Sequence, residues 1–219
     1  MNWWVHNLWN AGEHAMLISW IFWVLFSITL HELAHGWAAI WQGDRTPIEY
    51  QRMTMNPVVH MGVHSLIIFA LIGIAWGVMP TDPSRYRWRR KGRIIVSGAG
   101  PAMNVALAIV ALSAAVLWMR FGPTTQPLAD NVLTFLMTGG WLNLALAIFN
   151  MLPLPPLDGA SVLSGFSMRA YRLYQNPQAQ MIGMFILIVI FFSGIGGLFF
   201  GLAMSVSDGY VRLLAGLLP

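Results

Sequence analysis

The sequence predicts an all-α polytopic membrane protein with about four spanning helices plus a short re-entrant or hairpin element. Two observations carry this prediction. Hydrophobic residues make up 57% of the chain and charged residues only 9%, against a charged share of about 25% in soluble domains. Four apolar runs, at 15–40, 94–119, 132–152 and 181–206, each reach the roughly 20 residues that a membrane helix needs. The fourth run is interrupted by Gly194, Gly196 and Gly197.

The first run contains the strongest chemical signal of the chain. Residues 15–30 carry no charge, and they are followed directly by the pentapeptide His31-Glu32-Leu33-Ala34-His35. A carboxylate at the centre of a membrane helix costs about 2.5–3.5 kcal/mol on insertion scales, so its presence there points to a function. On a helix, the HExxH spacing places two imidazoles on one face with the glutamate beside them. This arrangement binds zinc and places a base next to the zinc-bound water.

A catalytic zinc ion needs a third protein ligand and an open fourth position. Three candidates remain open: Asp158, Glu49, and either His60 or His64. Asp158 is favoured, because the prolines at 153, 155 and 156 cannot continue a helix and Gly159 allows a tight turn beside the carboxylate. The chain could in this way fold the carboxylate back toward a metal between the helices.

The segments between the spans decide the topology. Residues 44–57 contain proline and polar residues and are expected to form a short extended or hairpin segment, with Gly43 capping the helix before it. The apolar stretch at 65–79 has only 15 residues and two glycines. If it crossed the membrane, His35 and Asp158 would lie toward opposite faces. We therefore expect residues 61–79 to form a re-entrant or interfacial hairpin, which is tolerable only against protein or water.

The distribution of positive charge supports the same topology. Without a crossing at 65–79, one side of the membrane receives ten of the twelve basic residues: Arg45, Arg52, Arg85, Arg87, Arg89, Arg90, Lys91, Arg93, Arg169 and Arg172. With a crossing, Arg45 and Arg52 change sides. The positive-inside rule favours the first arrangement and makes that side cytoplasmic. The basic run at 85–93 is too short to indicate nucleic acid and is expected to be a solvated loop facing anionic lipid.

Polar and small residues inside the other spans are expected to pack helices together. Asn104 is expected to form a hydrogen bond between helices, and Gly100 and the glycines at 194–201 are expected to allow close approach.

Several of these motifs, taken in order, resemble the site-2 protease family of intramembrane zinc metalloproteases, in its short bacterial form without PDZ or CBS domains. The resemblance extends from about Ile28 to Gly159. It comprises HELAH at 31–35, Gly43-Asp44, the stretch from Arg52 through Asn56-Pro57 to His60, Met79-Pro80 with Pro83, Ala99-Gly100-Pro101 with Asn104, and Asn150 with Pro153, Pro155-Pro156-Leu157 and Asp158-Gly159. One departure is that the loop from His60 to Ser65 lacks the acidic residue and the turn residues usual in close relatives.

The resemblance implies a single integral-membrane metalloprotease domain over residues 1–219. It implies His31, His35 and Asp158 as ligands of one zinc ion, Glu32 as general base, and Asn150 near the site, where it stabilises substrate or oxyanion. The implied substrate is a membrane-spanning protein cut within its transmembrane segment. The implied location is the bilayer of a bacterial cell (inner) membrane, with the active site toward the cytoplasm.

The main alternative is a non-hydrolytic membrane protein that binds or transports metal. Transporters normally repeat carboxylates and histidines along a path through several helices. In this chain the ionisable groups of the spans concentrate at 31–35, which favours the protease.

Overall fold

The computed structural model describes residues 3–217, and over this range the chain forms helices and no strands. Four helices are long and apolar enough to cross a membrane: α2 (His14–Trp41), α5 (Arg89–Phe121), α6 (Leu128–Asn150) and α10 (Gly196–Leu217). The prediction of an all-α membrane protein with four spanning helices is therefore confirmed.

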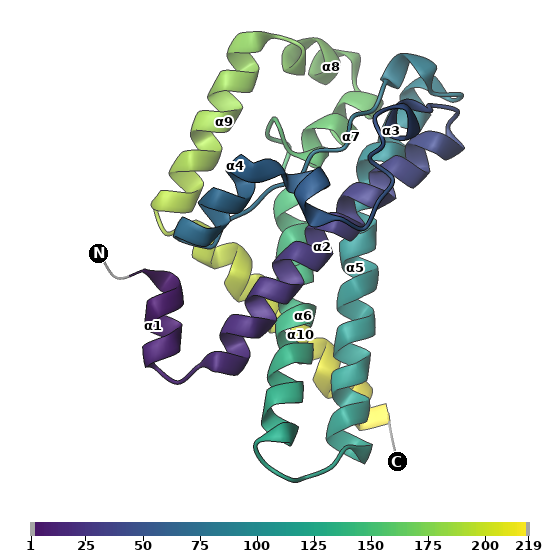
Figure 1. The fold of residues 1–219 in the computed structure, drawn as a ribbon. Helices are drawn as coiled ribbons and strands as arrows, with labels where there is room; N and C mark the ends of the chain where they lie inside the picture. The colour runs from purple at the N-terminus through teal and green to yellow at the C-terminus, as the bar shows by residue number, and fades with distance from the viewer. Residues whose placement is uncertain (1–2, 218–219) are drawn as a thin grey trace.

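Helices α2, α5 and α6 pack against one another and form the core, while α10 crosses behind α6 and also contacts α5 (Figure 1). Small residues allow this close packing. A Cβ on Gly139 of α6 would lie 2.2 Å from the ring of Trp23, and one on Gly140 would lie 2.2 Å from Leu112 of α5. Glycine has no side-chain carbon, so helix backbones can approach each other closely at such positions in lipid, where no hydrophobic force draws them together.

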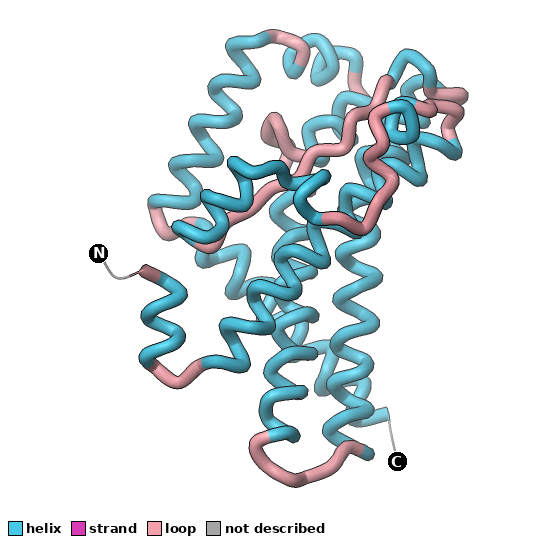
Figure 2. Tube along the Cα trace, in the orientation of Figure 1, coloured by secondary structure: helices cyan, strands magenta, loops and turns pink. Residues whose placement is uncertain are grey.

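The shorter elements connect these four helices. They are α1 (Trp4–Asn10), α3 (Thr46–Glu49), α4 (Pro57–Ile72), η1 (Pro83–Arg85), α7 (Asp158–Phe166), α8 (Met168–Tyr174) and α9 (Pro177–Phe192). Figure 2 shows long loop segments at the end of the molecule where α3 and α7 lie, whereas the opposite end has the α5–α6 loop. The segments that carry most of the basic residues therefore share one end.

The end of α2 has the geometry predicted for Gly43. This glycine has φ +97°, the left-handed conformation. Its N–H donates to Ile40, and the N–H of Asp44 donates to Ala39. These two bonds are the Schellman pattern, which satisfies the last carbonyls of a helix and turns the chain sharply.

The segment at 61–79 turns back on itself, as expected for a re-entrant element. Helix α4 ends at Gly73, which has φ +79°, and residues 74–82 return without regular secondary structure. Ser65 accepts a hydrogen bond from Trp76 N–H and donates one to its carbonyl, and Val78 donates to the carbonyl of His60. The outgoing helix and the returning chain thus form one hairpin-like unit.

Residues 44–57 do not form the extended or hairpin segment predicted for them. They contain the single helical turn α3 and a loop. The Asp44 side chain accepts the N–H of Thr46 at 2.9 Å, and Pro47 occupies the first turn of the helix. Proline suits that position because its fixed φ is helical and the missing N–H has no partner there. Both features favour a helical turn over a strand.

The fourth predicted span, 181–206, is also wrong in its bounds. The chain breaks at Gly194, which has φ +81°, so that α9 ends before it and the span-length helix begins at Gly196. Nothing lies within 4 Å of a Cβ placed on Gly194, Gly197 or Gly201. Gly194 therefore lies at the break between the two helices, Gly197 and Gly201 lie within α10, and none of the three provides the close packing expected of it.

Candidate metal centre

Two imidazoles from α2 face each other inside the bundle. His31 and His35 are one helical turn apart and both are buried, and their Nε2 atoms lie 3.0 Å apart. Their rings meet edge to face with centroids 4.7 Å apart. The two potential ligand atoms of the predicted motif therefore point to the same place.

Asp158 is brought to this place by the proline-rich loop after α6. Its Oδ2 lies 3.0 Å from Nε2 of His31, and its Oδ1 lies 3.3 Å from Nε2 of His35. A Cβ on the following residue, Gly159, would lie 2.2 Å from the carbonyl oxygen of Met151. Only glycine allows the start of α7 to approach the end of α6 so closely, and this approach carries the carboxylate inward.

The three side chains form a group that could hold a metal ion. One ligand atom from each of His31, His35 and Asp158 lies within 4.8 Å of the others. Gly100 of α5 leaves the space for this group, because a Cβ there would lie 2.4 Å from Nε2 of His35 and 2.5 Å from Nε2 of His31. The close approach predicted for Gly100 is therefore confirmed, and its neighbours are the two imidazoles. Two nitrogens and one carboxylate oxygen match the donor set of catalytic zinc sites.

The far nitrogen of each imidazole is held by a different kind of partner. Nδ1 of His35 lies 2.7 Å from the carbonyl oxygen of Val96. Nδ1 of His31 lies 2.5 Å from Oδ1 of Asn104, whose amide nitrogen in turn donates to Asn143 of α6 at 2.9 Å. The prediction that Asn104 bonds between helices is confirmed. Its second role, as the partner of His31, was not predicted.

Glu32 lies between the imidazoles in sequence and against residues 74–82 in space. It is buried, and among the described residues its carboxylate makes no hydrogen bond or ion pair. A Cβ on Gly77 would lie 2.6 Å from both Cγ and Oε1 of Glu32. The returning chain of the re-entrant element therefore passes directly over this carboxylate.

Asn150, the other predicted catalytic residue, lies at the C-terminal end of α6. Its amide nitrogen donates to the carbonyl of Leu146 in its own helix at 3.0 Å. It makes no hydrogen bond to His31, His35 or Asp158.

The alternative third ligands lie outside the cluster. Glu49 is exposed and pairs with Arg85 at 2.8 Å. His60 is buried and its Nε2 lies 2.6 Å from the carbonyl of Thr54, whereas His64 is exposed. The non-helical φ of +68° at Gly62 separates these two histidines, so they do not share one continuous helix face.

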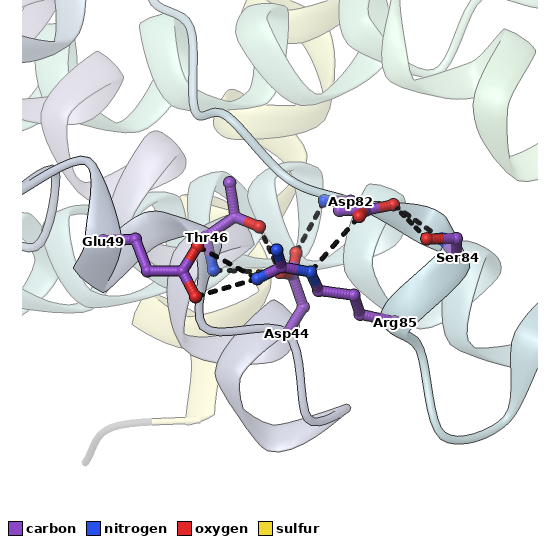
Figure 3. A network of polar contacts seen from close by, with 6 residues as sticks. All are labelled: Asp44, Thr46, Glu49, Asp82, Ser84 and Arg85. Carbon is purple, nitrogen blue, oxygen red and sulfur yellow. Dashed lines mark hydrogen bonds and ion pairs between the residues drawn. The ribbon is translucent and has the colours of Figure 1, made fainter.

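A buried carboxylate holds the loop after α2 to the end of the re-entrant element. Asp44 is fully buried, and its Oδ1 accepts both the N–H and the hydroxyl of Thr46 at 2.9 and 2.5 Å (Figure 3). Its Oδ2 accepts the N–H of Asp82 at 2.7 Å. Helix α4 forms hydrogen bonds with the backbone of residues 76 and 78, and Asp44 accepts the N–H of residue 82. The segment over Glu32 is therefore anchored on both sides.

The outer part of the same network is exposed and ionic. Arg85 reaches Glu49 at 2.8 Å and Asp82 at 3.3 Å (Figure 3). Hydrogen bonds from the hydroxyl and N–H of Ser84 lower the pKa of Asp82 below its ordinary value. The basic run at 85–93 was predicted to be a solvated loop, but residues 89–93 begin α5. Arg85 pairs with carboxylates, and Arg90 donates to the carbonyls at 165 and 166.

Comparisons with known proteins agree with this geometry. The model of peptidase family M50 matches residues 19–126 and 122–194 of the chain. YwhC of Bacillus subtilis (strain 168), provisionally named as a zinc metalloprotease, is 31% identical over 175 residues, which cover 79% of this chain and 80% of YwhC. Rip2 of Mycobacterium tuberculosis, provisionally named in the same way, is 28% identical over 215 residues, or 93% of this chain and 77% of Rip2.

No solved structure matches the chain significantly. The family model covers well over half of the sequence, and the relatives cover most of its length. The chain therefore belongs to peptidase family M50, the site-2 protease family, and is a zinc metalloprotease with membrane-spanning helices.

Proposed function

We propose that this protein hydrolyses peptide bonds within transmembrane segments of substrate proteins, and that His31, His35 and Asp158 are the ligands of its single catalytic zinc ion. The observation that carries the proposal is the convergence of these three side chains within 4.8 Å. They converge inside a bundle of helices that are long and apolar enough to cross a membrane, which supports a substrate bond that lies within the bilayer. We also propose that residues 1–219 act as one metalloprotease domain.

When bound, zinc supplies a Lewis acid that lowers the pKa of water from about 15.7 to about 7 and polarises a carbonyl. Glu32 acts as general base: its unpaired carboxylate takes the proton of the attacking water and delivers it to the leaving amine. Asn150 stabilises the oxyanion through its amide N–H. The amide nitrogen carries two hydrogens and donates one of them to the Leu146 carbonyl, so the second remains for the oxyanion.

The substrate is a membrane-spanning protein whose helix unwinds at the cleavage site, because a helical carbonyl already accepts a hydrogen bond. The basic segments share the end of the molecule that carries α3 and α7 (Figure 1). By the positive-inside rule, this end faces the cytoplasm of a bacterial cell (inner) membrane. The bilayer is then the second partner of the protein.

The test separates proteolysis from metal binding or transport. Glu32→Gln should keep one bound zinc ion and lose cleavage by about 10²–10⁴-fold, the usual contribution of a general base. Glu49→Gln is the matched control, because Glu49 is exposed and paired with Arg85, and it should keep both properties. The inactive Glu32→Gln form would first be used to capture the substrate by co-purification. Equal cleavage by wild type and Glu32→Gln would refute the proposal, as would zinc binding that survives Asp158→Ala.

A further inference from the structure

Three groups form a continuous hydrogen-bonded chain behind His31. Nδ1 of His31 lies 2.5 Å from Oδ1 of Asn104, the amide nitrogen of Asn104 lies 2.9 Å from Oδ1 of Asn143, and the amide nitrogen of Asn143 lies 2.8 Å from the carbonyl oxygen of Gly139. Asn104 and Asn143 are both fully buried. This row of hydrogen bonds therefore runs from α2 through α5 to α6, and its two amides have no contact with solvent.

The last group of the chain sets the orientation of all the others. A backbone carbonyl can only accept a hydrogen bond, so Asn143 must turn its NH₂ group toward Gly139 and its oxygen toward Asn104. That oxygen can also only accept, so Asn104 must present its own NH₂ group to Asn143 and its oxygen to His31. The Nδ1 atom of His31 must then carry a hydrogen, which leaves the lone pair on Nε2, the atom that faces Asp158.

We propose that Asn104 and Asn143 are positioning residues that hold His31 in the tautomer able to bind metal through Nε2. The inference rests on the proposed metal site. His35 reaches the same state by a shorter route, because its Nδ1 faces the carbonyl of Val96 directly. The tautomer of His31 thus depends on side chains that substitution can change, whereas that of His35 depends on the backbone.

Asn143 is the informative position, because it touches neither His31 nor the metal group. Asn143→Leu keeps the branching and the number of side-chain heavy atoms but removes the acceptor oxygen that orients Asn104. The amide of Asn104 can then turn its NH₂ group toward His31 and favour the wrong tautomer. When Asn104→Asp is added to Asn143→Leu, the side chain at 104 has two oxygens that only accept hydrogen bonds. Whichever oxygen faces His31 then accepts the hydrogen on Nδ1. We therefore expect Asn143→Leu to weaken zinc binding, and the added Asn104→Asp substitution to restore it.

The experiment measures the zinc dissociation constant of the purified full-length protein by chelator competition, together with the melting temperature of the metal-free form. Asn143→Leu should weaken zinc binding about 10–100-fold, the range for partners of metal ligands. The Asn104→Asp, Asn143→Leu double variant should regain most of that affinity. Asn143→Asp keeps the acceptor oxygen and should bind zinc more tightly than Asn143→Leu, whatever its melting temperature.

Thr138→Val is the matched control on the same helix, since Thr138 is buried and its hydroxyl contacts Met16 outside the chain of groups. It should lower the melting temperature and leave zinc affinity unchanged. Wild-type zinc affinity in Asn143→Leu, or a double variant or an Asn143→Asp form as weak as Asn143→Leu, would overturn the inference. If His31→Ala alone left zinc affinity unchanged, the proposed metal site itself would be refuted. This result differs from those that refute only the positioning role of Asn104 and Asn143.

Discussion

Replacing Gly100 by alanine tests the geometry of the metal site most directly. The new Cβ would lie 2.4 Å from Nε2 of His35 and 2.5 Å from Nε2 of His31. Unstrained contacts between such atoms are about 3.5 Å long, so both rings must retreat by about 1 Å. Metal–ligand distances tolerate only about 0.2 Å, and a misplacement of about 1 Å at a reacting centre costs about 100-fold in rate. We expect cleavage by Gly100→Ala to fall about 100-fold, because zinc is held weakly or not at all.

The assay is zinc content and chelator competition, followed by cleavage of the captured substrate. Gly98→Ala is the matched control: it lies on the same helix, nothing is within 4 Å of its Cβ, and alanine favours the helix by about 0.5–1 kcal/mol. It should bind zinc normally and melt at a slightly higher temperature than wild type. Normal zinc affinity and normal cleavage in Gly100→Ala would show that the described placement of the imidazoles is wrong.

Three further predictions concern the surroundings of the site. Gly77→Ala places a Cβ 2.6 Å from the Glu32 side chain, so turnover should fall at least 10-fold while zinc stays bound, and loss of zinc would contradict this. Asp44→Ala removes a fully buried acceptor of three hydrogen bonds, and chemical denaturation should show a loss of about 2–4 kcal/mol in the free energy of unfolding. Burial raises the pKa of Tyr86 from 10.0 to about 12, so its stabilising contribution is complete below pH 10 and is lost as the pH rises to about 12. Wild type should therefore lose more stability than Tyr86→Phe over that interval, and equal losses would exclude a buried Tyr86 hydroxyl.

The spanning helices and most of the site could be predicted because their signals are local. The absence of charge over residues 15–30 and the HExxH spacing concern a single helix, whose periodicity is fixed. Asp158 could be predicted because the prolines before it cannot continue a helix and Gly159 after it permits a tight turn. The glycines that interrupt the fourth run were expected to pack helices, but the division into two helices at Gly194 was not predicted. A glycine in an apolar run either packs helices or ends one, and only the neighbouring chain decides which.

The partners of the site could not be predicted because they depend on contacts between distant helices. Asn143 did carry a signal, an amide in an apolar span where polar groups are costly, but its partner Asn104 lies 39 positions earlier. Gly77 carried none, because its role comes from the path of the re-entrant chain over Glu32. The turn at α3 depended on Asp44, whose buried carboxylate joins two loops far apart in sequence.

The separation of 127 positions between His31 and Asp158 has a consequence for biosynthesis. A nascent polypeptide emerges from the ribosome from its N-terminus, so the two imidazoles enter the bilayer long before the carboxylate is translated. Until then the proposed triad is incomplete and the growing chain is inert. Proteolytic capability would thus arise only after residue 158 has been translated and has folded back onto the two imidazoles.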